Sequence, residues 1–243
     1  MLAMAMAQIP PQTDQLVTGW VADDDATHAV LQRWVRGEGG WAAVGGSVEA
    51  RLGSRGVAWG RGLHGEPLGP PKIEGDGRAP LGVFRLGPAF ADPPAPIPTQ
   101  GWPVLEVSPR DLWVEDPTSE HYNTHVRVPD GRPLTDWERS QRMHLGDDAH
   151  RLKVVVHHNT DSPVPGQGSA IFLHRWRRDG EAATAGCTAV APEALDTFVD
   201  WLSPGAHPVF VLLTDEAWSR YGVAWGLPSW VAGGTTAIPP EAP

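Results

Sequence analysis

Three features are scarce in this chain of 243 residues, and each scarcity excludes a class of protein. There is a single cysteine, Cys187, so no intramolecular disulfide can form and the core alone has to stabilise the fold. No run of eighteen apolar residues occurs, so the sequence predicts no membrane-spanning helix. Basic residues number 19 against 29 acidic ones, and the net charge of −10 argues against nucleic acid or an anionic membrane surface as a partner.

Turn-forming and aromatic residues, by contrast, are abundant. The chain has 28 glycines, 25 prolines and 12 tryptophans, a composition that suits many short strands better than long helices. We therefore expect a mainly β fold with a few helices, of the α+β class, forming one domain at residues 15–226. We find no internal repeat and no linker that would separate two domains.

The two ends of the chain differ in composition from this domain. Residues 1–7 contain only Met, Leu and Ala, and we interpret residues 1–14 as a leader or a signal-peptide remnant that is disordered. A misassigned start codon explains this stretch equally well, because no basic residue precedes it. The signal interpretation predicts a periplasmic or secreted protein of the cell envelope. Residues 227–243 are rich in Gly and Pro and are expected to form a C-terminal tail.

Hydrophobic patterns and breaker residues predict the elements between these ends. We expect strands at residues 15–21, 105–107, 112–114, 151–158 and 209–213, and a meander over residues 41–60 with a hairpin turn at Gly45 and Gly46. Helices are expected at residues 26–34, 135–150 and 192–202. The proline-rich segment 88–103 is expected to be irregular, because proline cannot donate to a sheet.

The single cysteine stands in a setting that favours chemistry. In Thr184-Ala185-Gly186-Cys187 the small residues leave room for a substrate, and the backbone N–H groups of Ala185 and Gly186 can point toward a developing oxyanion. His174, thirteen positions earlier at the end of an apolar run, is the candidate acceptor of the thiol proton. A free thiol is mostly protonated at neutral pH, so a nucleophilic cysteine needs such a partner. Packing as a small buried hydrophobe is the alternative.

Polar residues in the neighbouring motifs are candidates for substrate binding. They are Tyr122, Asn123, His158, Asn159, Ser169, Trp176 and Thr184. The charged block of residues 72–78 has two interpretations, an internal salt-bridged turn or a rim that binds substrate charges.

A zinc site is an alternative use of the same residues. His174 and Cys187, together with His157 or His158, offer the nitrogen and sulfur ligands that zinc prefers. Adjacent residues on a strand point to opposite sides, so only one of the paired histidines can join the others. We favour acyl transfer and expect no metal.

Three blocks, at residues 72–84, 112–123 and 168–189, carry a family resemblance. In this order and at these separations they resemble the YkuD-like L,D-transpeptidase catalytic domain over about residues 15–213. The resemblance implies a mixed β-sandwich or barrel, with Cys187 as nucleophile and His174 as base. It also implies a thioester acyl-enzyme formed on peptidoglycan stem peptides and no cofactor. We further expect the protein to be a monomer and a target of carbapenems.

Two positions depart from the pattern of characterised members, which carry Ser-His-Gly-Cys and a polar residue two places after the cysteine. Here these positions hold Ala185 and Ala189. The thiol, the imidazole and backbone donors suffice for acyl transfer, so the departure bears on how the substrate is oriented. An L,D-carboxypeptidase that hydrolyses the same bond, and a catalytically silent peptidoglycan-binding domain, are the competing hypotheses.

Overall fold

The structure, a computed structural model, describes residues 9–229. The strands of the main sheet are β1 (Gln15–Val21), β2 (His28–Gly37), β3 (Gly40–Arg51), β4 (Val57–Trp59), β5 (Ala79–Ala91), β6 (Val104–Glu106), β9 (Leu152–Val156), β10 (Phe172–Arg175), β11 (Thr188–Val190) and β12 (Val209–Thr214). A second, two-stranded sheet pairs β7 (Asp111–Trp113) with β8 (His125–Arg127). The mainly β class expected from composition is confirmed.

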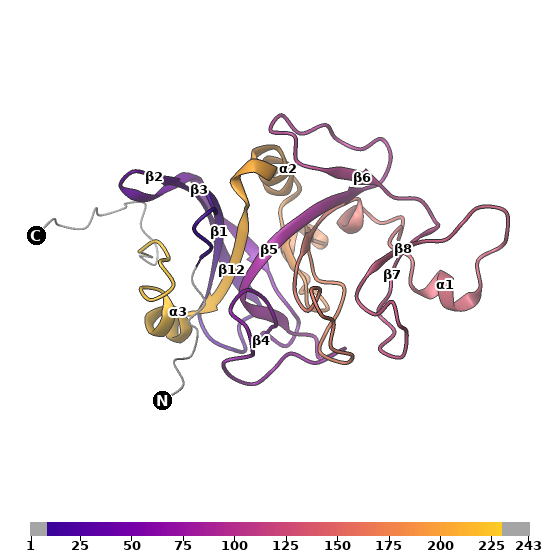
Figure 1. The fold of residues 1–243 in the computed structure, drawn as a ribbon, viewed down its shortest axis with the longest axis horizontal. Helices are drawn as coiled ribbons and strands as arrows, with labels where there is room; N and C mark the ends of the chain where they lie inside the picture. The colour runs from indigo at the N-terminus through magenta and orange to yellow at the C-terminus, as the bar shows by residue number, and fades with distance from the viewer. Residues whose placement is uncertain (1–8, 230–243) are drawn as a thin grey trace, which may run out of the picture.

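Eight strands close into a barrel (Figure 1). They follow the order β12, β1, β2, β3, β11, β10, β9, β5, and β5 pairs back with β12. Most neighbours are antiparallel, but β1 runs parallel to β12 and β10 runs parallel to β11. The mixed barrel that the family resemblance implied is therefore present.

The strands nearest the cysteine are buried on both faces, which explains why β9 is a continuous apolar run apart from one lysine. Side chains alternate along a strand, so Val154 and Leu173 point into the large barrel core. Val155 and Phe172 point outward into a smaller cluster that also contains Trp113. Two different hydrophobic layers thus fix β9 and β10.

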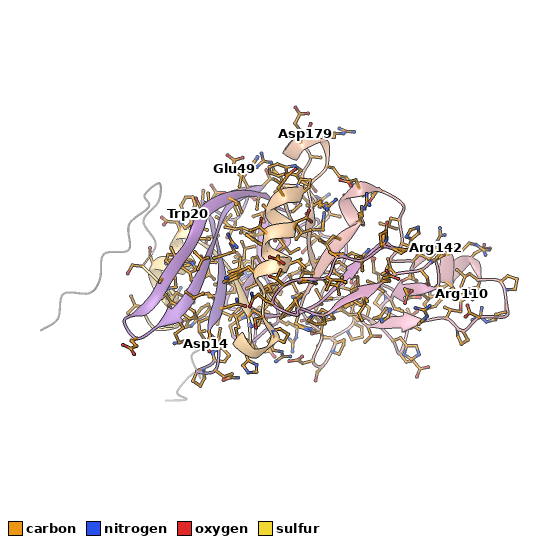
Figure 2. The ribbon with its side chains drawn as sticks, turned by 90° about the horizontal axis from the view of Figure 1, so that it is seen from above. Asp14, Trp20, Glu49, Arg110, Arg142 and Asp179 are labelled. Atoms are coloured by element: carbon orange, nitrogen blue, oxygen red, sulfur yellow. The ribbon has the colours of Figure 1, made fainter. Side chains whose placement is uncertain are left out.

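The outer layer comes from residues 107–150, which we call the lobe. The lobe contains β7, β8, the helix α1 (Asp136–Ser140) and the short 3-10 helix η1 (Asp148–His150). A capping box between Thr135 and Glu138 starts α1. Figure 2 shows Arg110 and Arg142 of the lobe at the end of the molecule opposite Trp20 of β1. The lobe therefore covers only the β9–β10 side of the barrel.

Two helices outside the lobe complete the barrel core. Helix α2 (Pro192–Trp201) begins with proline, whose missing N–H costs nothing in the first turn, and buries Leu195, Phe198 and Val199 in the barrel core. Helix α3 (Asp215–Tyr221) directly follows β12 and is capped by Thr214. None of the helices in the described part of the chain is long and apolar enough to cross a membrane.

Several sequence predictions for single elements hold. Strand β1 has the expected bounds, and the expected strands at 105–107, 112–114, 151–158 and 209–213 correspond to β6, β7, β9 and β12. The predicted helix at residues 192–202 is α2. The polar segment 135–150 holds α1 and η1 in place of one continuous helix.

The helix predicted at residues 26–34 is wrong, because this segment belongs to β2. Its apolar spacing fits a helical face, but β2 pairs along both edges, with β1 and with β3. Backbone pairing on two sides outweighs a local periodicity that is compatible with either structure.

The hairpin turn predicted at Gly45 and Gly46 is also wrong. The chain turns at Glu38 and Gly39, between β2 and β3, and the glycine pair lies inside β3. The register with β2 shifts at this point, and Gly45 has a φ of +65°. These glycines therefore form a bulge, the other structure that glycine favours in strands.

Two further expectations need correction. Residues 88–91 are not irregular, because β5 continues to Ala91 and pairs with β9 across a register irregularity at Pro88. Residues 9–14 are not disordered: Ile9 is part of the barrel core, and its N–H donates to the carbonyl oxygen of Trp225 at 3.2 Å. The rest of the predicted leader, and the tail from residue 230 on, lie outside the described residues.

Candidate active site

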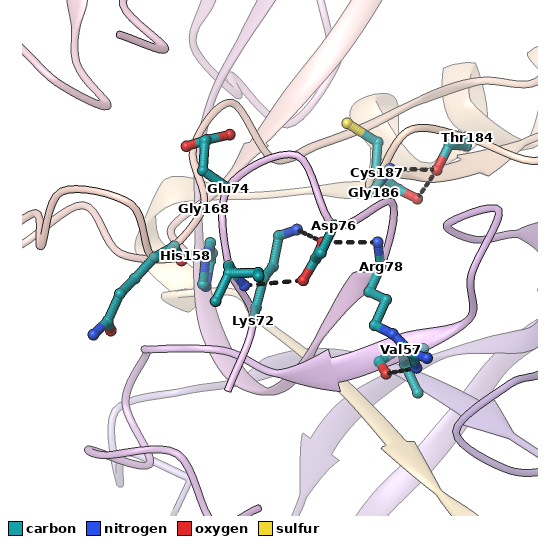
Figure 3. A network of polar contacts seen from close by, with 12 residues as sticks. Val57, Lys72, Glu74, Asp76, Arg78, His158, Gly168, Thr184, Gly186 and Cys187 are labelled. Carbon is teal, nitrogen blue, oxygen red and sulfur yellow. Dashed lines mark hydrogen bonds and ion pairs between the residues drawn. The ribbon is translucent and has the colours of Figure 1, made fainter. Parts of the chain in front are cut away.

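Cys187 ends a tight loop that leads into β11. The Thr184 hydroxyl accepts a hydrogen bond from the Gly186 N–H at 3.1 Å and donates to the Cys187 carbonyl oxygen at 2.7 Å (Figure 3). Gly186 has a φ of +148°, a backbone conformation that is strained for any residue with a Cβ atom. Thr184, predicted to bind substrate, thus holds the loop together. The Gly186 N–H, predicted as an oxyanion donor, is engaged by this hydroxyl.

The Cys187 sulfur lies against the backbone that leads into β10. The Phe172 N–H donates to Sγ at 3.4 Å, and Sγ lies 3.5 Å from the Ala170 carbonyl oxygen. Burial raises the pKa of the Cys187 thiol to about 11, and the Phe172 N–H opposes this rise. In this environment the thiol is protonated at neutral pH.

His174 lies on the same sheet face as the cysteine. In the parallel pairing, His174 is opposite Ala189, and the same register places Phe172 opposite Cys187. Alternation then turns the side chains of all four residues to one side of the sheet, with His174 and Cys187 as diagonal neighbours.

The imidazole of His174 is fixed in orientation. Its Nδ1 lies 2.7 Å from the carbonyl oxygen of Arg175, and its ring stacks on His150 with centroids 4.9 Å apart. Burial, followed by the charge of His150, lowers the pKa of His174 to about 4. His174 is therefore neutral at pH 7, as a proton acceptor has to be.

A pocket of about 230 Å³ opens beside the sulfur, between the barrel and the lobe. Four chain segments line it: the loop at Lys72, Glu74 and Gly75; the lobe with Trp113, Glu115, Gln141, Arg142, Met143, Leu145 and His150; Lys153 with residues 169–172; and Ala185, Gly186 and Cys187. Of the predicted site residues, Cys187, Ala185, Gly186 and Ser169 line this pocket. His174 lies behind His150, outside the lining.

Two buried lysines, Lys72 and Lys153, line this pocket, and Lys153 was not predicted from the sequence. Lys72 is 4% exposed and its Nζ lies 2.7 Å from Asp76. Lys153 of β9 is 2% exposed and donates to the Met143 carbonyl oxygen at 2.5 Å. Burial lowers the pKa of Lys153 to about 8. A charged residue inside the apolar run Leu-Lys-Val-Val-Val is the sequence signal that could have found Lys153.

The charged block at residues 72–78 combines its two interpretations. Asp76 accepts from Lys72 and from the backbone N–H groups of Ile73 and Arg78, which is the internal salt-bridged turn (Figure 3). Glu74, however, lines the pocket and accepts a hydrogen bond from the Tyr122 hydroxyl. Tyr122 is thus buried behind Glu74 and does not itself line the pocket.

Asn123 connects the lobe to the strand that carries the sulfur contacts. Its side chain accepts from the Trp113 indole N–H at 2.9 Å and from the Ala170 N–H at 3.1 Å. Its amide donates to the carbonyl oxygens of His158 and Asn159 at 2.9 and 2.7 Å. All four bonds lie within the protein, so Asn123, predicted to bind substrate, supports the site from behind.

The remaining predicted residues lie away from the pocket. His158 is enclosed between the Arg61 N–H and the Gln167 carbonyl oxygen, and burial lowers its pKa to about 3. The side chain of Asn159 bonds to loop backbone at Val164 and Gly168. Trp176 lines a separate surface hollow.

The structure does not place His157 or His158 at the pocket of Cys187. His157 lines another hollow and pairs with the Thr160 hydroxyl at 2.9 Å. Within residues 9–229, no group of three or more His, Cys, Asp or Glu side chains is placed to hold a metal ion. The zinc alternative therefore has no support in the described part of the chain.

Comparison with known protein families identifies one family for this chain. The family model of YkuD, the L,D-transpeptidase catalytic domain, matches residues 36–211. Among solved structures, the helical cell shape determining protein Pgp2 from Campylobacter jejuni aligns with a TM-score of 0.37 and 14% identity, over 83% of this chain and 48% of that one. The chain thus spans about half the length of that protein. No curated protein sequence matches the chain.

Proposed function

Because the chain belongs to the YkuD L,D-transpeptidase catalytic domain family, we propose that it catalyses cysteine-dependent acyl transfer on peptidoglycan stem peptides. The observation that carries this proposal is the thiol of Cys187, which lines a pocket of about 230 Å³ and shares a sheet face with the neutral imidazole of His174. A substrate of this kind places the reaction in the cell envelope.

The reaction has two acyl transfers. In the first, the Cys187 sulfur attacks the carbonyl carbon of an L-to-D peptide bond, the C–N bond breaks, and the terminal D-residue leaves as an amine that has gained a proton. In the second, the neutral amine of another stem attacks the thioester, the C–S bond breaks, and the proton that the amine loses returns to the sulfur and restores the Cys187 thiol. The thiol proton is the one that the leaving amine receives, so the site needs a group that carries it.

His174 is the proposed carrier of that proton. Its Nδ1 faces the Arg175 carbonyl oxygen, which favours the tautomer protonated at Nδ1 and leaves Nε2 as the accepting nitrogen. Transfer from a thiol with a pKa of about 11 to an imidazole with a pKa of about 4 is strongly uphill in the unliganded site. The thiolate thus has to be stabilised by other groups in the pocket.

Substrate contacts are proposed for the residues that the pocket exposes. Ser169 and Ala185 line it together with Cys187, and Glu74 and Glu115 supply carboxylates. Glu115 has a raised pKa, because of burial and the nearby charge of Glu74. Carboxylates in this position suit the ammonium group of an acceptor stem.

The test uses purified disaccharide tetrapeptide stems and mass spectrometry of the products. Wild type is expected to form cross-linked dimers, and Cys187→Ala to form none. His174→Gln should lose most of the activity, whereas His28→Gln, a matched control at an exposed histidine of β2, should retain it. Free D-alanine without dimers, even at high acceptor concentration, would replace the transferase by an L,D-carboxypeptidase. No product from wild type at all would refute both.

A further inference from the structure

The whole chain contains two lysines, and both lie at the cysteine. Lys72 and Lys153 are the only lysines among 243 residues, both are at least nine-tenths buried, and both line the pocket that Cys187 lines. The other basic residues of the chain are arginines. Two ammonium groups buried beside one thiol therefore form a distinct electropositive site.

The two lysines differ in how their charge is balanced. Lys72 is paired with the carboxylate of Asp76 at 2.7 Å. Lys153 has no carboxylate oxygen within 4 Å among residues 9–229, and its hydrogen bond goes to the neutral carbonyl of Met143. Burying an ammonium group without a counter-ion is costly, and such groups cluster at functional sites. Among residues 9–229, Lys153 is thus a buried cation without a paired carboxylate, and an anion formed in the pocket would balance its charge.

The sheet places Lys153 close to the sulfur. Lys153 is opposite His174 across the β9–β10 pair, so it faces the same side as His174, Phe172 and Cys187. The Phe172 ring centroid lies 6.0 Å from the Lys153 Nζ, and the Phe172 N–H contacts Sγ. Phe172 therefore lies next to both the Lys153 ammonium group and the Cys187 sulfur.

We propose that Lys153 is the counter-charge of the Cys187 thiolate. The thiol proton leaves for His174 or solvent, Lys153 keeps its own proton, and the buried pair becomes neutral overall. Ala185 and Ala189 leave the surroundings of the sulfur without the polar side chains of characterised relatives, and Lys153 supplies charge from β9, which lies beyond β10 in the sheet. This inference rests on the proposed nucleophile and adds a residue that acts through the sulfur.

Other charged groups also act on Lys153, and the test has to separate them. Asp92, Asp147 and Cys187 raise the pKa of Lys153 against the lowering by burial, and Lys153 in turn lowers the pKa values of His150 and His174. The titratable and charged groups around the pocket are Lys72, Glu74, Asp92, Glu115, Arg142, Asp147, His150 and His174.

The direct test is the rate at which iodoacetamide alkylates the single cysteine, measured across pH. Alkylation requires the thiolate and no peptidoglycan, so this test is independent of the stem assay. Lys153→Met, which keeps the packing, is expected to slow alkylation at pH 7 about tenfold or more and to shift the profile to higher pH. Lys153→Arg should stay within about threefold of wild type. Arg220→Met removes an exposed cation of α3, outside this pocket, and should change the rate little.

Equal profiles for Lys153→Met and wild type would overturn the proposal, as would equal losses in the Met and Arg variants. If Lys153→Met does not fold, the coupling is measured from the other partner. With 13C-labelled lysine the NMR spectrum contains two side-chain signals, and Cys187→Ala should lower the pKa of the Lys153 signal. An unchanged Lys153 titration in Cys187→Ala would refute the pairing.

Discussion

The loop that carries Cys187 depends on one hydroxyl, and replacing Thr184 by valine removes it without changing the side-chain shape. The change breaks two hydrogen bonds, from the Gly186 N–H at 3.1 Å and to the Cys187 carbonyl oxygen at 2.7 Å. Each such bond contributes about 1 kcal/mol, and Gly186 is buried, so its N–H is left without a partner. We expect the free energy of unfolding to fall by about 2 kcal/mol.

The same change should affect chemistry more than stability. Freed from Thr184, the loop no longer fixes the sulfur against Phe172, and misplacement by about 1 Å costs up to about a hundredfold in rate. Urea unfolding followed by tryptophan fluorescence measures the first effect, and alkylation of Cys187 together with the stem assay measures the second. Thr184→Ser keeps the hydroxyl and is the matched control.

The serine variant is expected to stay within about 1 kcal/mol of wild type and to retain most of the rate. This role of the Thr184 hydroxyl would be contradicted if Thr184→Val unfolds at the wild-type urea concentration and reacts at the wild-type rate. It would also be contradicted if the serine variant loses as much stability and rate as the valine variant, since the hydroxyl would then not be the cause.

Three further predictions concern the support of the site. Asn123→Ala removes four buried hydrogen bonds and should lower the free energy of unfolding by about 3–5 kcal/mol in urea denaturation; a loss below about 1 kcal/mol would contradict it. Gly186→Ala strains a φ of +148° and places Cβ 3.0 Å from a backbone oxygen, so alkylation should slow severalfold, whereas Gly205→Ala, with no atom within 4 Å, should behave as wild type. Lowering the pH from 7 to 5 should lower the free energy of unfolding by about 2 kcal/mol through His158, because this histidine has a pKa near 6.5 in the unfolded chain and of about 3 in the folded protein. The urea midpoints at the two pH values should differ less in His158→Gln than in wild type.

Local sequence patterns correctly predicted the elements whose apolar spacing is typical of one type of secondary structure alone. Helix α2 and strands β1, β9 and β12 combine an unambiguous apolar pattern with clear breakers. The error at β2 arose because its spacing fits both periods, and only pairing with β1 and β3 decides between them. Barrel closure between β5 and β12 depends on contacts far apart in the sequence, which no local window contains.

For the site, the motifs predicted Cys187 and His174 as candidates, but not the residues of the lobe that line the pocket. Cys187 and His174 follow from their spacing and from the family resemblance, and the barrel brings them to one side. Lys153 was missed because a single lysine in an apolar strand has no motif. Asn123 and Thr184 were expected to contact substrate, but the polar atoms of both side chains form hydrogen bonds to the backbone around the site.

The central claim is that Cys187 is a nucleophile that forms an acyl-enzyme. It is tested most directly by intact-mass spectrometry after incubation with a carbapenem, comparing wild type with Cys187→Ala. We expect one covalent adduct on wild type and none on the variant, since the chain has one thiol. An equal adduct on Cys187→Ala, or no adduct on folded wild type, would contradict it.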